Sequence, residues 1–191
     1  MRLSKFKKKH IFCIEENWTH DLKDKASIRT ALDFLEHNAE IKPIRKDCST
    51  IDQFKDLVET SLQKRYKQHS IIYLAFHGSP GCLHIGKRKK LDFSTIAELL
   101  DGRAADKIIH FGSCSTLNLD GWELRRFWKD TGALAISGYT KDIDFIESSV
   151  LDILYFRKCQ EYRKVPLIER DMKEYYGRLM RELGFKMMHE R

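Results

Sequence analysis

Several features are scarce or missing in this sequence of 191 residues. It has only three prolines and no internal repeat, which excludes a proline-rich linker and a repeat protein. No stretch of about eighteen residues is apolar and free of charge, so the sequence predicts no membrane span. The apolar run at 11–14 passes directly into Glu15 and Glu16, and it is too short for the core of a signal peptide. We therefore expect a cytoplasmic protein.

The five cysteines are odd in number, widely spaced and contain no Cys-x-x-Cys pair. This pattern excludes a disulfide framework and favours a reducing compartment. Cys82 and His84 would lie on the same side of a strand, but their spacing matches no common zinc motif. We therefore expect no metal site and no cofactor.

The composition combines enough apolar residues for a core with a basic surface. Apolar residues make up 42% of the chain and aromatic residues 11%, which excludes a disordered chain. We expect a basic N-terminal tail at 1–9 and one domain at 10–191 that includes a C-terminal helix at 167–183. The formal charge of +7 leaves a nucleic-acid-binding α/β domain as an alternative. The basic runs lack interleaved aromatic residues, however, so we do not favour nucleic acid as a partner.

Apolar runs of strand length alternate along the chain with segments of helical periodicity. The expected strands are residues 10–15, 40–45, 71–76, 107–112 and 133–138, with a small hairpin at 83–93. The expected helices are residues 27–38, 50–65, 94–100, 122–129, 142–158 and 167–183. Ser27 and Thr50 are the predicted N-caps of the first two helices. The alternation predicts an α/β fold, a three-layer sandwich of a mostly parallel sheet with helices on both faces.

Two of the predicted strands end in turns that carry reactive side chains. His77 and Gly78 follow the strand at 71–76, and Cys114 follows the strand at 107–112. If these strands are neighbours, about 4.8 Å apart, the imidazole can take the proton of the thiol and leave a nucleophilic thiolate. The backbone N–H groups of Gly78 and Cys114 are then the expected oxyanion donors. Taken singly, each side chain is more often structural, and only the shared position at strand ends favours a catalytic pair.

The two motifs together resemble those of a known superfamily. The strand ending in His-Gly at 71–78 and the strand ending in a small residue and Cys at 108–114 resemble the caspase-like (clan CD) cysteine peptidases. The segment 138–144 is similar to the CHAT-like domains of bacteria. The resemblance implies a caspase-like fold in which His77 is the base and Cys114 is the nucleophile. It also implies hydrolysis of peptide or protein substrates through an acyl-enzyme, without a metal.

The sequence also departs from the family. The caspase signature Gln-Ala-Cys with a following Gly is absent around Cys114. Caspase-like enzymes that cut after Arg or Lys use acidic residues in the substrate pocket. The candidates for that pocket are Asp47, Ser115, Asp142 and Asp144. Alternatively, Asp142 is a helix N-cap and Asp47 only lies beside the start of a helix.

The motifs leave other interpretations open. The same fold without activity would be an interaction module in which Trp18 or Tyr139 blocks the reactive pair. An active peptidase that is latent until a protein partner activates it is a further alternative. Glu15 and Glu16 follow the first strand, where they either orient His77 or belong to a solvated loop. The C-terminal helix either completes the domain or forms a dimer contact.

Overall fold

The structure is a computed structural model that describes residues 7–19, 21, 23, 25–86 and 89–190. The strands are β1 (Ile11–Glu15), β2 (Pro43–Asp47), β3 (Ile71–Ala75), β4 (Gly78–Ser79), β5 (Cys82–Ile85), β6 (Lys89–Asp92), β7 (Ile108–Phe111), β8 (Ala135–Tyr139) and β9 (Phe185–His189). The helices are α1 (Arg29–Ala39), α2 (Ile51–Leu62), α3 (Phe93–Leu100), α4 (Gly121–Thr131), α5 (Phe145–Cys159) and α6 (Val165–Leu183). A short 3-10 helix, η1 (Lys64–Tyr66), follows α2.

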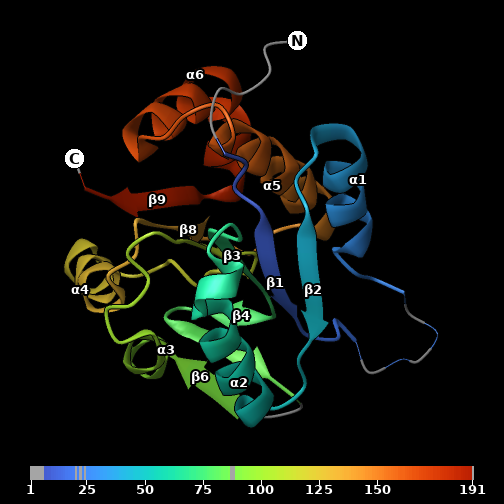
Figure 1. The fold of residues 1–191 in the computed structure, drawn as a ribbon, viewed down its shortest axis with the longest axis vertical. Helices are drawn as coiled ribbons and strands as arrows, with labels where there is room; N and C mark the ends of the chain where they lie inside the picture. Colours follow the sequence, from blue (N-terminus) through green and yellow to red (C-terminus); the bar gives the residue numbers. More distant parts are fainter. Residues whose placement is uncertain (1–6, 20, 22, 24, 87–88, 191) are drawn as a thin grey trace.

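The strands form a large central sheet and a small second one. The central sheet has the order β2-β1-β3-β7-β8-β9, and the small sheet has the order β4-β5-β6. In the central sheet, β2, β1, β3, β7 and β8 run parallel, as Figure 1 shows for β1 and β2. The last strand, β9, pairs antiparallel with β8. The predicted mostly parallel sheet is confirmed, and the predicted hairpin is the antiparallel pair β5 and β6. Strand β9 was not predicted from the sequence.

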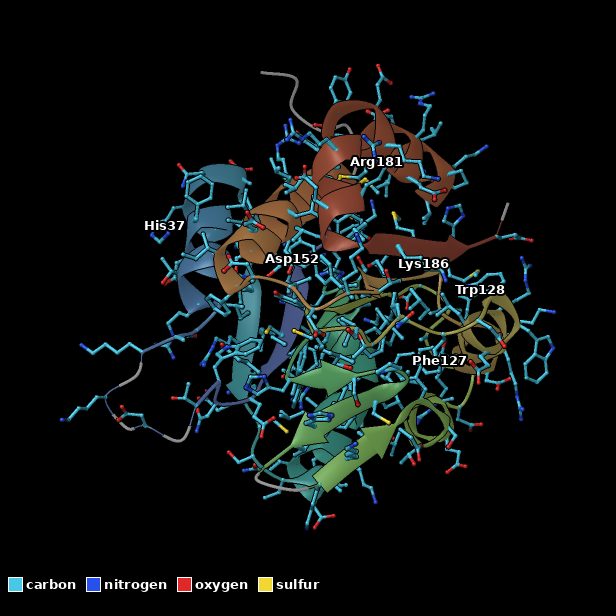
Figure 2. All side chains as sticks on the ribbon, turned by 180° about the vertical axis from the view of Figure 1, so that it is seen from behind. His37, Phe127, Trp128, Asp152, Arg181 and Lys186 are labelled. Atoms are coloured by element: carbon cyan, nitrogen blue, oxygen red, sulfur yellow. The ribbon has the colours of Figure 1, made fainter. Side chains whose placement is uncertain are left out.

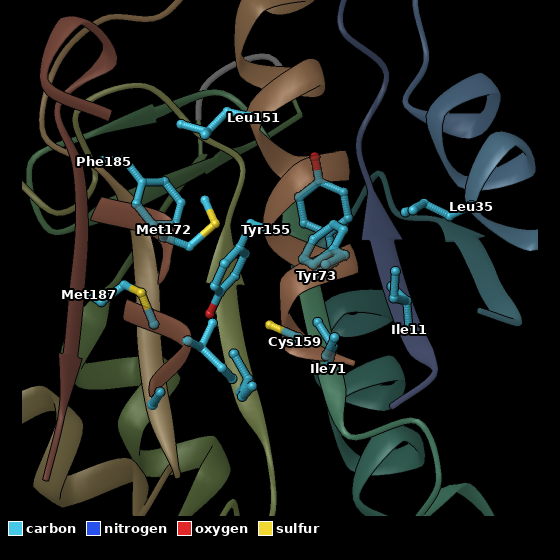
Figure 3. Close-up of a cluster of buried hydrophobic side chains, with 14 of the residues drawn as sticks. Ile11, Leu35, Ile71, Tyr73, Leu151, Tyr155, Cys159, Met172, Phe185 and Met187 are labelled. Carbon is cyan, nitrogen blue, oxygen red and sulfur yellow. The ribbon is translucent and has the colours of Figure 1, made fainter. Parts of the chain in front are cut away.

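Alternate residues of each central strand face opposite layers of helices. On β3, Ile71 and Tyr73 pack with α1, α5 and α6, whereas Ile72 and Leu74 pack with α2, α3 and α4. Figure 3 shows part of the first cluster, with Tyr73 and Tyr155 between the strands and α5. Because both faces of β1, β3, β7 and β8 are buried, these four strands are largely apolar in the sequence. The predicted three-layer α/β sandwich is confirmed.

A polar network is buried in the layer of α5. Asp152, labelled in Figure 2, is 3% exposed and accepts hydrogen bonds from Tyr73 Oη at 2.6 Å and Tyr139 Oη at 2.5 Å. His110 lies 2.8 Å from Asp152 through Nε2 and 2.9 Å from Ser137 Oγ through Nδ1. Burial, and then the charge of Asp152, raises the pKa of both tyrosines, so they remain protonated donors. The network joins β3, β7 and β8 to α5.

The starts of the helices agree with only part of the predicted caps. Thr50 is the N-cap of α2, and its side chain accepts a backbone N–H of the first turn, as predicted. The N-cap position of α1 is Ile28, one residue after the predicted Ser27, and Ile28 has no side-chain bond to the helix. Ser27 Oγ nevertheless accepts the N–H of Arg29, the first residue of α1, at 3.1 Å. Asp144, not Asp142, caps α5, since the Asp144 carboxylate accepts two N–H groups of its first turn.

Two lysines before β1 bond to the body of the domain. Lys9 Nζ donates to the carbonyl oxygens of Cys159 at 2.6 Å and Tyr162 at 2.7 Å, near the end of α5. Lys8 Nζ donates to the Ala39 carbonyl at 2.9 Å, at the end of α1. Both lysines belong to the segment 1–9, which the sequence predicted to be a basic tail. Residues 1–6 of that tail lie outside the described residues.

Candidate active site

The register between β3 and β7 aligns the two predicted reactive residues. Leu74 pairs with Phe111, the last pair of the two strands. His77 and Cys114 each follow three residues later, since 77 − 74 and 114 − 111 both equal 3. The strands are parallel and adjacent, about 4.8 Å apart, so both turns leave the sheet at its carboxyl edge. The predicted adjacency of the two strands is confirmed.

The two turns are packed against each other at Gly78. A Cβ atom at this position would lie 2.5 Å from Thr116 Cγ2 and 2.8 Å from the carbonyl oxygen of Cys114. Gly81 N–H donates to the Thr116 carbonyl at 3.1 Å and joins the turns a second time. The absence of a side chain at Gly78 therefore permits the close approach that brings the turn of His77 against the turn of Cys114.

The imidazole of His77 is exposed and bonds to a backbone carbonyl. His77 Nε2 lies 2.7 Å from the carbonyl oxygen of Trp18. Because a carbonyl oxygen can only accept, Nε2 carries the proton in this arrangement. The lone pair of the neutral ring is then on Nδ1, which is the nitrogen that remains to accept a proton. The Trp18 indole also lies edge-on to the imidazole, with ring centroids 5.4 Å apart.

Cys114 is half-buried and lies in a turn with a constrained backbone. Its Sγ is 4.0 Å from the carbonyl oxygen of Ile143. The next residue, Ser115, has a φ of 55°, a left-handed conformation that is uncommon for a residue with a Cβ. Ser115 N–H donates to the Lys141 carbonyl at 2.8 Å, which fixes this conformation to the segment after β8. The Cys114 turn is therefore held against the segment after β8, at Lys141 and Ile143.

Three of the other four cysteines are more deeply buried than Cys114. Burial raises the pKa of the Cys48 thiol to about 11 and that of the Cys159 thiol to about 12. Burial also raises the pKa of Cys13 well above its usual value. Because the thiolate is the reactive form, these three thiols are inert at neutral pH. All five cysteines are free, and only Cys82 is exposed to an intermediate extent as Cys114 is.

Within the described part of the chain, the backbone N–H groups of Cys114 and Gly78 lie outside the hydrogen bonds of the strands and turns. The N–H of Cys114 has no acceptor among the residues that the structure describes. His84 N–H donates to the His77 carbonyl, so the next pair of β4 and β5, Gly78 with Leu83, is a pair without hydrogen bonds. The N–H of Gly78 therefore lies outside the ladder. Free N–H groups on both turns are what an oxyanion site requires, which supports the prediction for Gly78 and Cys114.

The structure separates the four predicted pocket residues. Ser115 Oγ donates to Asp142 Oδ1 at 2.7 Å, and the Asp142 side chain is exposed. The Asp144 carboxylate instead caps α5. Asp47 pairs with Arg45 at 2.7 Å on the edge strand β2, which β1 and β3 separate from β7. Ser115 follows Cys114 in the chain, and this hydrogen bond joins Asp142 to it.

Cys82 and His84 lie on the same side of β5, as predicted, but they do not form a metal site. His84 Nε2 lies 2.9 Å from Ser79 Oγ. Within the described residues, no three His, Cys, Asp or Glu side chains are grouped so that they could bind a metal ion. In the same part of the chain, no helix has the length and apolar character that a membrane span requires.

The group that bonds to His77, the carbonyl of Trp18, was not predicted from the sequence. A backbone carbonyl carries no signal of residue type, so only its position was available. Glu15 and Glu16 follow β1, which is the neighbour of β3, and this position led to the expectation that one of them orients His77. Neither carboxylate bonds to His77 directly, but Glu15 accepts the indole N–H of Trp18 at 2.8 Å.

Comparison with known proteins shows the family of the chain but gives no activity for it. No curated protein matches the sequence. One family model, described as a family of unknown function (DUF6642), matches residues 8–189. This match covers nearly the whole chain, so the protein belongs to the DUF6642 family.

Proposed function

We propose that the protein is a cysteine endopeptidase of the caspase-like type, with Cys114 as the nucleophile and His77 as the base. The register of β3 and β7 carries this proposal, because it brings both residues to adjacent strand ends. The contact at Gly78 and the free N–H groups of the two turns support it. The resemblance of both motifs to the caspase-like peptidases supplies the reaction class.

The proposed reaction uses a thiolate and an acyl-enzyme. His77 Nδ1 takes the proton of Cys114 Sγ, and the sulfur attacks the carbonyl carbon of the scissile peptide bond. The N–H groups of Gly78 and Cys114 bind the oxyanion that forms. His77 then donates its proton to the leaving amine, and the C–N bond breaks to leave a thioester on the sulfur. A water molecule that loses a proton to His77 hydrolyses this thioester and releases the new carboxylic acid.

Asp142 is proposed to bind a basic side chain of the substrate, that of the residue before the scissile bond. Asp142 is exposed, is oriented by Ser115 at 2.7 Å and follows β8, the strand next to β7. A carboxylate in this place binds the guanidinium of Arg or the ammonium of Lys through charge-assisted hydrogen bonds. The five free cysteines agree with a reducing, cytoplasmic setting, and the proposed partners are peptides or proteins.

Alkylation of the two partly exposed thiols tests the catalytic pair. Cys114 should react with iodoacetamide faster than Cys82, as peptide mapping by mass spectrometry measures for each site. The His77→Ala variant should slow Cys114 to the rate of Cys82, because the base that forms the thiolate is lost. Cys114→Ala should abolish cleavage of a peptide library, and the matched control Cys82→Ala should retain it. The proposal is wrong if Cys114 reacts no faster than Cys82 and no peptide is cut.

A further inference from the structure

We propose that Glu15 and Trp18 are positioning residues for His77, and this inference rests on the proposed function. Glu15 is the last residue of β1 and is 1% exposed, so its carboxylate lies inside the domain. Strand β1 lies next to β3, with Glu15 paired to Ala75, two residues before His77. The carboxylate reaches His77 through Trp18, which is three residues further along the chain.

Both oxygens of the Glu15 carboxylate are fully engaged. Oε1 accepts the indole N–H of Trp18 at 2.8 Å and the backbone N–H of Ile28 at 2.9 Å. Oε2 accepts the hydroxyl of Ser27 at 3.0 Å and Nε of Arg45. A buried carboxylate with these donors cannot rotate without losing several bonds at once. It therefore fixes both ends of the loop between β1 and α1. At the second end it accepts the N–H of Ile28 and the hydroxyl of Ser27.

The predicted pocket residue Asp47 has its place in the same chain of contacts. It pairs with Arg45 at 2.7 Å, and Arg45 in turn bonds to Glu15. The ion pairs raise the pKa of Arg45 against the opposing effect of burial, so its charge is retained beside Glu15. Asp47 is thus connected, through Arg45 and Glu15, to the loop between β1 and α1. It lies on the edge strand β2, three strands away from β7.

Trp18, which is bonded to Glu15, makes two contacts with His77. Its carbonyl accepts Nε2–H of His77 at 2.7 Å, and its indole lies edge-on to the imidazole with centroids 5.4 Å apart. Phe145, the first residue of α5, packs against the indole with centroids 5.2 Å apart. The indole N–H bond to Glu15 is therefore the polar contact that prevents the indole from turning between its two aromatic neighbours.

The consequence for His77 concerns its tautomer. A neutral imidazole without a fixed acceptor exchanges its proton between the two ring nitrogens, and only the form with the lone pair toward the thiol acts as a base. The Trp18 carbonyl selects the form with the proton on Nε2. Loss of the bond from Trp18 to Glu15 releases this carbonyl and reduces the fraction of His77 that is ready to take the proton of Cys114.

Two tryptophan variants separate positioning from stability. Trp18→Phe removes the indole N–H and retains an aromatic ring against His77 and Phe145. The matched control is Trp128→Phe on α4, which removes the bond of 2.7 Å from the indole N–H to the Ala133 carbonyl. Both variants should lose similar stability in urea unfolding. Only Trp18→Phe should slow alkylation of Cys114 near neutral pH, by about five- to tenfold, and shift the rise of the rate to higher pH.

The outcomes distinguish this inference from the proposed function. If His77→Ala leaves the alkylation of Cys114 unchanged, the proposed function fails, and the inference fails with it. If His77→Ala slows the reaction but Trp18→Phe reacts like Trp128→Phe, only the inference is wrong. A second variant, Glu15→Gln, keeps an oxygen for the Trp18 indole and loses the charge that faces Arg45. It should lose stability yet keep most of the Cys114 reactivity, and a loss equal to that of Trp18→Phe would contradict the role of the indole bond.

Discussion

Gly78 lies directly against Cys114, because a methyl group on Gly78 would come within 2.8 Å of the Cys114 carbonyl oxygen. The same methyl group would lie 2.5 Å from Thr116 Cγ2. The clash involves backbone, so Gly78→Ala should push the turn of His77 away from the turn of Cys114. We expect a loss of stability of roughly 1–3 kcal/mol, measured by urea unfolding, and a slower alkylation of Cys114.

Gly121 provides the matched control for this substitution. It begins α4, and a Cβ at this position would meet nothing within 4 Å. Gly121→Ala should therefore change stability by less than about 1 kcal/mol and leave the reactivity of Cys114 unaltered. Equal effects of the two substitutions on Cys114 would show that the contact at Gly78 does not position the thiol.

The charge of Asp142 should decide which side chain precedes the bond that is cut. Asp142→Asn keeps an acceptor for Ser115 Oγ but removes the negative charge of this exposed group. We expect kcat/KM for peptides with Arg or Lys before the scissile bond to fall roughly ten- to hundredfold, the effect of losing a charge-assisted hydrogen bond. Fluorogenic peptides that differ only at this position provide the measurement.

A control variant removes the same charge at a distance from the site. Asp106 is exposed and precedes β7, at the opposite end of the strand from Cys114. Asp106→Asn should leave the preference for basic side chains unchanged. If both variants reduce the rate equally, the effect reflects the net charge of the protein, and Asp142 does not line the pocket.

The parallel strands could be predicted because their residue pattern indicates that they are buried. Residues 71–76 and 107–112 are continuous apolar runs, as expected for strands covered by helices on both faces. Strand β9 gave no such signal, because Lys186, Met188 and His189 are only partly buried and its pairing with β8 depends on distant parts of the chain. Tertiary pairing, not local pattern, makes this segment a strand.

Only the parts of the candidate site that depend on side-chain type and on position after a strand could be predicted from the sequence. His77 and Cys114 were found because each follows a strand that the sequence shows clearly. The Trp18 carbonyl was missed, because main-chain groups are the same in every residue. Asp142 and Asp144 are two residues apart and both fit a helix start, so only the backbone geometry shows that Asp144 is the cap.

The buried carboxylate of Asp152 should contribute strongly to stability. It accepts hydrogen bonds from Tyr73 and Tyr139 and lies 2.8 Å from His110 Nε2. Asp152→Asn places an amide N–H₂ among these donors, and we expect a loss of about 3–5 kcal/mol in the free energy of unfolding. Asp56→Asn, on the exposed side of α2, should change it by less than about 0.5 kcal/mol. A loss for Asp152→Asn as small as that of the control would contradict the network.

The histidines at the amino end of the sheet should make stability depend on pH. Burial lowers the pKa of His69, and the charges of His10 and Lys107 lower it further. Burial also lowers the pKa of His10, whose ring lies 5.5 Å from that of His69. In the unfolded chain both histidines bind a proton as the pH falls through about 6.5. In the folded protein they bind it only at a lower pH, because their pKa values are lowered. The unfolded state therefore binds more protons in this window, and stability falls as the pH falls through it.

Urea unfolding at about pH 7.5 and about pH 5.5 measures this dependence across the ordinary pKa of histidine. The midpoint should be lower at the acidic pH in the unmodified protein. The fall should be smaller in His69→Gln, because that variant removes one of the histidines with a lowered pKa. Gln68→Ala changes an exposed neighbour and keeps both imidazoles, so its midpoints should run parallel to those of the unmodified protein. If His69→Gln and Gln68→Ala show the same pH dependence, another group is responsible, and the burial of His69 does not set the acid sensitivity of the fold.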